Sequence, residues 1–103
     1  MADPMIVRPK VTNGVTEVKV LMKHPMDSGI VKDSAGNIIP AHYITEVTAT
    51  YAGKVVFSAN WGTAVSKDPY LAFKFKGGAV GEKVTMMWKD NKGGTRTDTK
   101  DIA

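Results

Sequence analysis

Residues 16–24 read TEVKVLMKH, and this short stretch already indicates how the chain folds. Val18, Val20 and Met22 occupy every second position, with polar or charged residues beside most of them. Successive side chains of a β-strand point to opposite faces, so this spacing is typical of a strand with one buried and one solvated face. We therefore expect a sheet that covers a core with one side only.

The same period of two recurs along the rest of the chain, and no segment combines the length and the periodicity of a helix. Turn residues such as Asn13-Gly14 and Ala52-Gly53 separate the alternating stretches. About seven short strands in a chain of 103 residues are typical of an immunoglobulin-like β-sandwich, so we expect an all-β protein with a single domain spanning residues 1–103. The strands are predicted at residues 5–11, 16–24, 42–51, 54–61, 70–76, 82–89 and 95–102.

Composition excludes several classes of protein. The chain has no cysteine, which excludes disulfides, thiolate nucleophiles, iron–sulfur clusters and blue-copper sites. Its net charge of +4 comes mainly from lysine, with only two arginines, a balance that argues against base recognition in nucleic acids. No apolar run approaches the roughly 18 residues of a membrane span. The first residues lack the basic and apolar regions of a signal peptide, so the sequence taken alone predicts a cytoplasmic protein.

Candidate catalytic and metal-binding residues are sparse. His24 and His42 are the only histidines, and Met22, Met26, Met86 and Met87 add sulfur atoms that a Cu(I) site could use. No close ligand spacing supports such a site, so we expect strand-end histidines and core methionines, with no metal and no other cofactor. An iron centre like that of superoxide reductases would need several histidines and a cysteine. The serines lack a nucleophile elbow, and Asp90, beside a turn, is expected to be solvated, so no catalytic residue is assigned.

The outer faces of the two predicted sheets differ in character. If residues 5–11, 16–24 and 70–76 form one sheet, its outer face is basic and suits the steering of anions or acidic partners. The outer face of the other sheet shows three large apolar side chains among threonines and serines, which is typical of a partner interface, although scattered surface hydrophobes are also common. The basic face comprises Lys19, Lys23, Lys74 and Lys76, with Arg8 and Lys10, and the candidate interface comprises Ile44, Val56 and Met87.

Several phrases of the chain resemble segments of the SoxZ family, in the same order and spacing from end to end. Single phrases of this length are weak signals, but several in register over so short a chain are specific. They are HPMDSG at residues 24–29, IPAHYI at 39–44, WG at 61–62 with VSKDPY at 65–70, FKFKGG at 73–78 and WKDNKG at 88–93.

This resemblance implies a sandwich fold and a tight heterodimer with SoxY in the oxidation of thiosulfate. It implies that sulfur is carried on a cysteine of SoxY, where the other Sox pathway enzymes, indirect partners of this chain, act on it. It also implies that this chain is a non-catalytic partner subunit without a catalytic motif. It also implies export to the periplasm together with SoxY, in place of a signal peptide on this chain. The apolar face could form a homodimer without SoxY. The alternative is a free-standing binding or adhesion module, which should expose aromatics for sugar stacking, whereas most aromatics here alternate inward.

Overall fold

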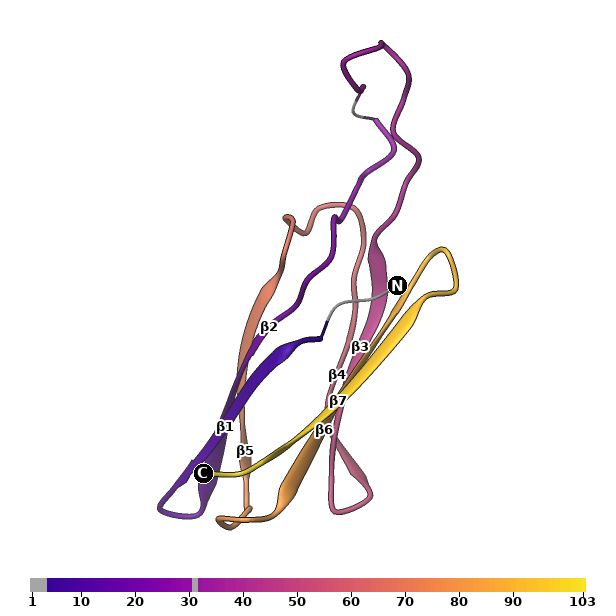
Figure 1. Cartoon of the computed structure of the whole chain (residues 1–103). Coiled ribbons are helices and arrows are strands. Elements are labelled where there is room, and N and C mark those ends of the chain that lie inside the picture. The colour runs from indigo at the N-terminus through magenta and orange to yellow at the C-terminus, as the bar shows by residue number, and fades with distance from the viewer. Residues whose placement is uncertain (1–3, 31) are drawn as a thin grey trace.

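The computed structural model describes residues 4–30 and 32–103, which form two antiparallel sheets and no helix (Figure 1). Because no helix occurs in the described part, none could cross a membrane. The predicted all-β sandwich of seven strands is therefore confirmed. The strands are β1 (Ile6–Thr12), β2 (Val15–Leu21), β3 (Ile44–Tyr51), β4 (Lys54–Asn60), β5 (Tyr70–Lys76), β6 (Lys83–Asp90) and β7 (Thr95–Asp101).

The strand order is β1-β2-β5 in one sheet and β4-β3-β6-β7 in the other. Two tight hairpins, β1–β2 and β3–β4, turn at Asn13-Gly14 and Ala52-Gly53, where all four residues have φ between 52° and 76°. Positive φ at both central residues is the geometry of a type I′ turn, which matches the right-handed twist of the strands it joins. The asparagine and the glycines of these turns therefore fix two of the hairpins locally.

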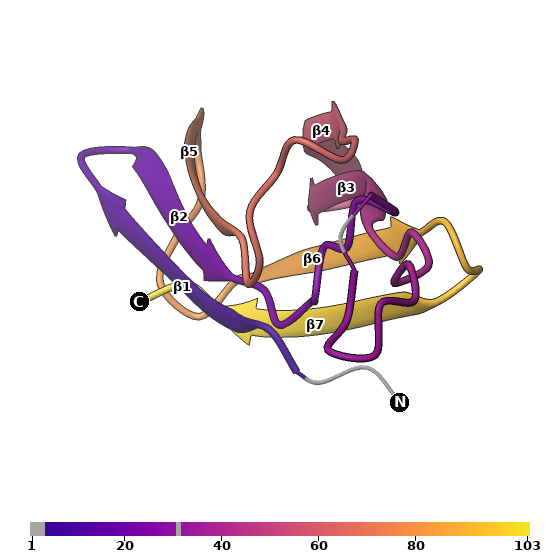
Figure 2. The same cartoon turned by 90° about the horizontal axis from the view of Figure 1, so that it is seen from above.

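The two sheets are joined along one side by the end of the chain. After β7, the Ala103 amide donates to the Pro9 carbonyl (3.0 Å) and the Val11 amide donates to the Ala103 carbonyl (3.1 Å). β1 and β7 consequently lie next to each other, as Figure 2 shows from above. Toward β4 and β5 the sheets are linked by Phe57 and Phe73, whose rings stack with centroids 4.7 Å apart.

The core lies between the sheets and is built from the predicted alternating residues. Val18, Val20, Met22 and Met86 are fully buried, and Trp88 is nearly so. The Trp88 indole Nε1 is buried and has no hydrogen-bond partner among the described residues. Burial of apolar side chains of this size contributes roughly 1.5–3 kcal/mol each, which makes this layer the main source of stability.

Two β-bulges change which residues face outward on β3 and β4. The register between β3 and β6 shifts between Ile44 and Glu46, and the register between β3 and β4 shifts between Ala49 and Thr50. A bulge adds one residue to one strand and reverses the alternation beyond it. As a result Ile44 is completely buried, so its predicted place on the outer face is wrong.

The second bulge affects β4. Thr50 is opposite Val55 and Ala49 is opposite Phe57, so Val56 is the extra residue. Val56 packs against the core, and Val55 is 62% exposed. The predicted place of Val56 on the outer face is therefore wrong, and Val55 lies there instead. Of the three predicted interface residues, Met87 alone is classed as exposed on the outer face, at 38%.

The basic face forms as the strand pattern predicts, with one exception. Lys19 lies opposite Arg8, while Lys74 and Lys76 lie on β5, and all of these side chains are exposed. Glu17 lies among them and approaches Lys19 at 3.8 Å. Lys23 follows the end of β2 and belongs instead to the cleft described next. The functional role of the basic face stays a prediction.

Candidate functional site

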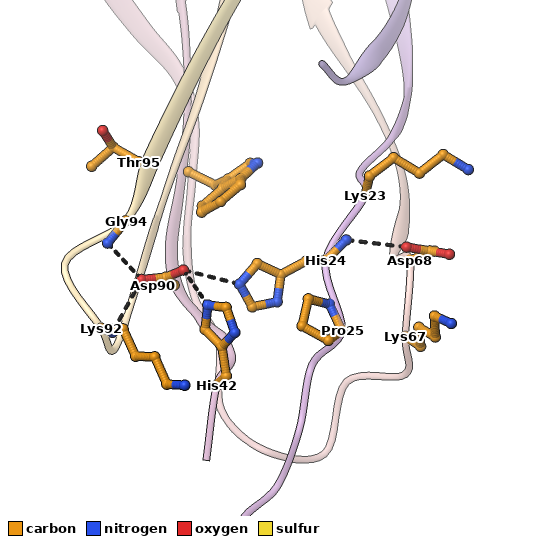
Figure 3. A pocket seen from close by; sticks show the side chains of 11 residues that line it. Lys23, His24, Pro25, His42, Lys67, Asp68, Asp90, Lys92, Gly94 and Thr95 are labelled. Carbon is orange, nitrogen blue, oxygen red and sulfur yellow. Dashed lines mark hydrogen bonds and ion pairs between the residues drawn. The ribbon is translucent and has the colours of Figure 1, made fainter. Parts of the chain in front are cut away.

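A cleft of about 680 Å³ opens at the end of the sandwich where β2 and β6 finish (Figure 3). Four segments that are far apart in the sequence form its walls. They are residues 23–25 after β2, residue 42 before β3, residues 67–68 before β5, and the end of β6 with the β6–β7 turn. The lining residues include Lys23, His24, His42, Lys67, Asp68, Trp88, Asp90, Lys92 and Thr95.

Asp90, the last residue of β6, is the centre of the polar wall and is only 4% exposed. Its Oδ1 accepts hydrogen bonds from the backbone amides of Lys92 (3.0 Å) and Gly94 (2.7 Å), which closes the β6–β7 turn. Its Oδ2 accepts from Nε2 of His42 (2.8 Å) and Nε2 of His24 (3.1 Å). Four donors thus serve one carboxylate, and the expectation that Asp90 is solvated is wrong.

The hydrogen bonds also determine the tautomer of His24. Its Nδ1 accepts the backbone amide of Met26 at 3.1 Å, so the ring proton is on Nε2, which donates to Asp90. Burial lowers the pKa of His24 below its ordinary value, against the opposing effect of the hydrogen bond to Asp90. This side chain is therefore a neutral imidazole with both nitrogens occupied.

The pKa of Asp90 is also lowered. Burial alone would raise it, but the hydrogen bonds from His24 and His42 and from the amides of Gly94 and Lys92 together outweigh burial. The ionised carboxylate is consequently the stable form, and its charge is compensated by the four donors around it.

Further contacts hold the two histidines in place. The His24 ring meets Trp88 edge-on, with centroids 5.1 Å apart and planes at 87°, and it lies 4.5 Å from the His42 ring. The backbones of His42 and Asp27 exchange two hydrogen bonds of 2.7 and 2.9 Å. The backbone amide of His24 donates to Asp68 Oδ1 (3.1 Å) and its carbonyl accepts the Asp68 amide (2.9 Å). The two histidines are therefore each held in place by a residue of another segment, Asp68 for His24 and Asp27 for His42.

His24, His42 and Asp90 form a group whose potential ligand atoms all lie within 4.8 Å of one another. Their hydrogen bonds do not favour a metal ion. A metal at Nε2 of His24 would displace the proton to Nδ1, where it would face the amide of Met26, another donor. Both oxygens of Asp90 already accept two donors each. The arrangement suits a hydrogen-bonded cluster better than a metal centre.

Sequence reasoning missed this cluster, although it had quoted its members. His24, His42 and Asp90 are separated by many positions, so no local spacing connects them. Four of the quoted segments nevertheless meet at the cleft: residues 24–29, 39–44, 65–70 and 88–93. The predicted interface residue Met87 does not line the cleft, nor do Ile44 and Val56.

The fold is a two-sheet β-sandwich that also occurs in solved structures of other proteins. The chain is similar to two structures of mutant superoxide reductase (neelaredoxin) from Archaeoglobus fulgidus in the reduced form. Sequence identity is 20% in both cases, with TM-scores of 0.61 and 0.63. The matches cover 99% and 96% of this chain and 90% and 86% of those chains. At this identity the likeness concerns the fold alone.

Sequence comparison then gives the family. The family model of the sulphur oxidation protein SoxZ matches residues 6–101, nearly the whole chain. The chain belongs to the SoxZ family, as the quoted segments predicted, and its role lies in sulfur oxidation. A search of the curated proteins finds no significant match.

Proposed function

We propose that this chain is the non-catalytic partner subunit of SoxY in a heterodimeric sulfur carrier that serves thiosulfate oxidation. The observation that carries the proposal is the match to the SoxZ family over residues 6–101. The lack of cysteine supports it, because covalent sulfur must then be carried by another chain. The buried cluster supports it too, since its hydrogen-bonding groups are largely committed to one another rather than to a substrate.

We place the SoxY contact on the outer face of the β4-β3-β6-β7 sheet. Met87 lies there between Thr48 and Thr97, and Val55 lies opposite Thr50. Exposed apolar side chains among uncharged hydroxyl groups are typical of the centre of a protein interface. The outer face of the other sheet carries the basic residues, so we assign to it the steering of anionic partners.

We also propose that the heterodimer works in the periplasm and that this chain is exported together with SoxY. The support is the SoxZ family assignment, because the implied route needs no signal on this chain. Fractionation of cells that express both subunits should place this chain with SoxY in the periplasm. Deletion of the SoxY leader should retain both chains in the cytoplasm.

Co-expression with SoxY from the same genome tests the central proposal. A tag on SoxY should co-purify this chain as a 1:1 complex, with the mass measured by light scattering after gel filtration. After incubation with thiosulfate and the other Sox enzymes, intact-mass spectrometry should find added sulfur on SoxY and none on this chain. A chain that never associates with SoxY would contradict the proposal and favour a free-standing binding module.

A further inference from the structure

β5 is an edge strand that lacks the protection found at the other edges of the two sheets. It ends the order β1-β2-β5, and none of the described strands lies beyond it, as Figure 2 shows from above. On the opposite side of the sandwich, β1 contains Pro9, is bonded to Ala103 and lies next to β7. The edge strand β4 carries the extra residue Val56, which disturbs its ladder. By contrast, β5 pairs with β2 in unbroken register from Tyr70 to Lys76, and such a regular edge is a template for a further strand.

The hydrogen bonds at both ends of β5 show which of its backbone groups face outward. The Met22 amide donates to the Pro69 carbonyl (2.9 Å), and the Gly77 amide donates to the Gly14 carbonyl (2.6 Å). Opposite residues of an antiparallel ladder alternate between bonded and non-bonded pairs, so the odd-numbered residues from 69 to 77 are the ones bonded to β2. The even-numbered residues therefore direct their N–H and C=O groups to the open edge. These residues are Tyr70, Ala72, Lys74 and Lys76.

The side chains of the same even-numbered residues make this edge positive. Lys74 and Lys76 are exposed on the basic face, and neither forms an ion pair within residues 4–30 and 32–103. Glu17 lies opposite Lys74 on β2, but its carboxylate approaches Lys19 instead. Arg8 lies opposite Lys19 on β1, so the excess positive charge extends across the sheet.

The inward side chains of β5 are incompletely covered. Leu71 and Phe73 pack against the core but remain partly exposed. On the closed side of the sandwich, Val7 of β1 is 5% exposed and Ile102 is 1% exposed. The open edge therefore combines free backbone groups and positive charge with an apolar layer that an added strand could extend.

We propose that the β5 edge binds an extended acidic segment of a partner protein, which adds a strand to the β1-β2-β5 sheet. Main-chain hydrogen bonds to the outward groups of β5 hold the segment, and its alternate side chains give specificity. The segment needs acidic residues at every second position, beside Lys74 and Lys76, and apolar residues between them, beside Leu71 and Phe73. The two lysines disfavour a second copy of this chain in the same place, because its β5 would bring like charges onto one face.

The test uses the isolated, isotope-labelled chain and a synthetic peptide in which valine and glutamate alternate. The titration is followed by amide NMR at constant ionic strength. Saturable shifts are expected at the outward amides of Tyr70, Ala72, Lys74 and Lys76. A peptide in which valine alternates with lysine should bind at least tenfold more weakly, because like charges then face each other across the two strands.

Two N-methylated forms of the glutamate peptide test the pairing itself without any change to the protein. Methyl groups on the glutamate nitrogens remove the donors of one edge of the peptide strand, and methyl groups on the valine nitrogens remove those of the other edge. An added strand pairs through one of its edges only, so one form should lose binding and the other should keep it.

Variants of the chain test the charge and the edge separately. Lys74→Gln with Lys76→Gln should weaken binding of the glutamate peptide at least tenfold. The matched control is Lys89→Gln with Lys100→Gln on the other sheet, which changes the net charge equally and should alter affinity less than twofold. Ala72→Pro removes an outward N–H without breaking a bond to β2, so the amide spectrum should remain native while peptide binding is lost.

Equal effects of the two methylation patterns, or equal losses in the two lysine variants, would overturn the proposal. Self-association that Ala72→Pro abolishes, without saturable peptide binding, would assign the edge to a second copy of this chain and refute an acidic partner. Because the titration uses this chain alone, its outcome does not depend on the proposed complex with SoxY.

Discussion

Replacement of Asp90 by Asn should destabilise the domain strongly, because the carboxylate accepts four hydrogen bonds and an amide cannot. An asparagine oxygen can keep the amides of Lys92 and Gly94, and its NH₂ group then faces both histidines. His42 can adapt, since its Nδ1 has no partner within residues 4–30 and 32–103, so the ring proton can move there and Nε2 can then accept. His24 cannot adapt, because its Nδ1 already accepts the amide of Met26. One buried pair of facing donors therefore remains.

The magnitude follows from these contacts. A hydrogen bond to a charged group contributes about 1.5–3 kcal/mol, and an unsatisfied buried donor costs about 1–3 kcal/mol. Loss of both histidine bonds, with partial recovery at His42, should reduce the free energy of unfolding by roughly 2–4 kcal/mol. For a domain of this size, that loss corresponds to a decrease in Tm of roughly 10–30 °C.

The assay is urea and thermal unfolding at pH 7, followed by tryptophan fluorescence and circular dichroism. The matched control is Asp101→Asn, which removes an exposed carboxylate paired with Lys83 and should change stability by less than about 0.5 kcal/mol. The lowered pKa of Asp90 adds a second readout. Its contribution is present above the unfolded pKa and is lost as the pH falls through the lower folded value, so wild type and D90N should converge in strong acid. Equal stability of D90N and D101N at neutral pH would refute the reasoning.

The remaining predictions concern single positions with clear readouts. The double variant Val55→Lys and Met87→Lys should stay folded and lose SoxY in a pull-down. In contrast, Val56→Lys should lower the free energy of unfolding by about 2 kcal/mol or more, because Val56 packs on the core. Undiminished SoxY binding by the folded double variant would place the contact elsewhere. Because the folded pKa of His24 is below its ordinary value of 6.5, the unfolded chain takes up the proton first, and stability should fall by at most about 1.4 kcal/mol per pH unit as the pH drops below 6.5. His24→Gln should flatten that part of a pH series of urea midpoints, and an unchanged slope would contradict the assignment. Gly94→Ala should cost about 1–3 kcal/mol, since its Cβ would lie 2.8 Å from a carboxylate oxygen of Asp90, and a neutral effect in thermal unfolding would mean that the turn shifts freely.

The sequence could predict the strands because alternation is a local property. Val18, Val20 and Met22 are buried as the pattern requires. The bulges on β3 and β4 could not be predicted in this way, since an extra residue leaves no mark in the composition of a strand. Ile44 and Val56 were misplaced for this reason, while Met87, on the regularly paired β6, was not.

The cluster around Asp90 could not be predicted from the sequence, for a different reason. Its members are brought together by the packing of one sheet on the other, which no local spacing records. One signal was present: His24, His42 and Asp90 each occur in a quoted family segment and each lies at or just outside a strand end. Polar residues at the ends of several strands can meet at one end of a sandwich. The three residues could have been grouped for this reason.

The junction at Asp90 also bears on the lifetime of the folded state. It connects positions 66 and 48 residues apart in the chain, so it requires that both sheets are already assembled. Contacts of such long sequence separation close large loops, which costs chain entropy. We predict that they form after the folding transition state. Their energy then acts mainly on the unfolding rate, by roughly two orders of magnitude for a contribution of 2–4 kcal/mol. The cluster would thus provide kinetic stability: it would slow unfolding of the sandwich far more than it would speed folding.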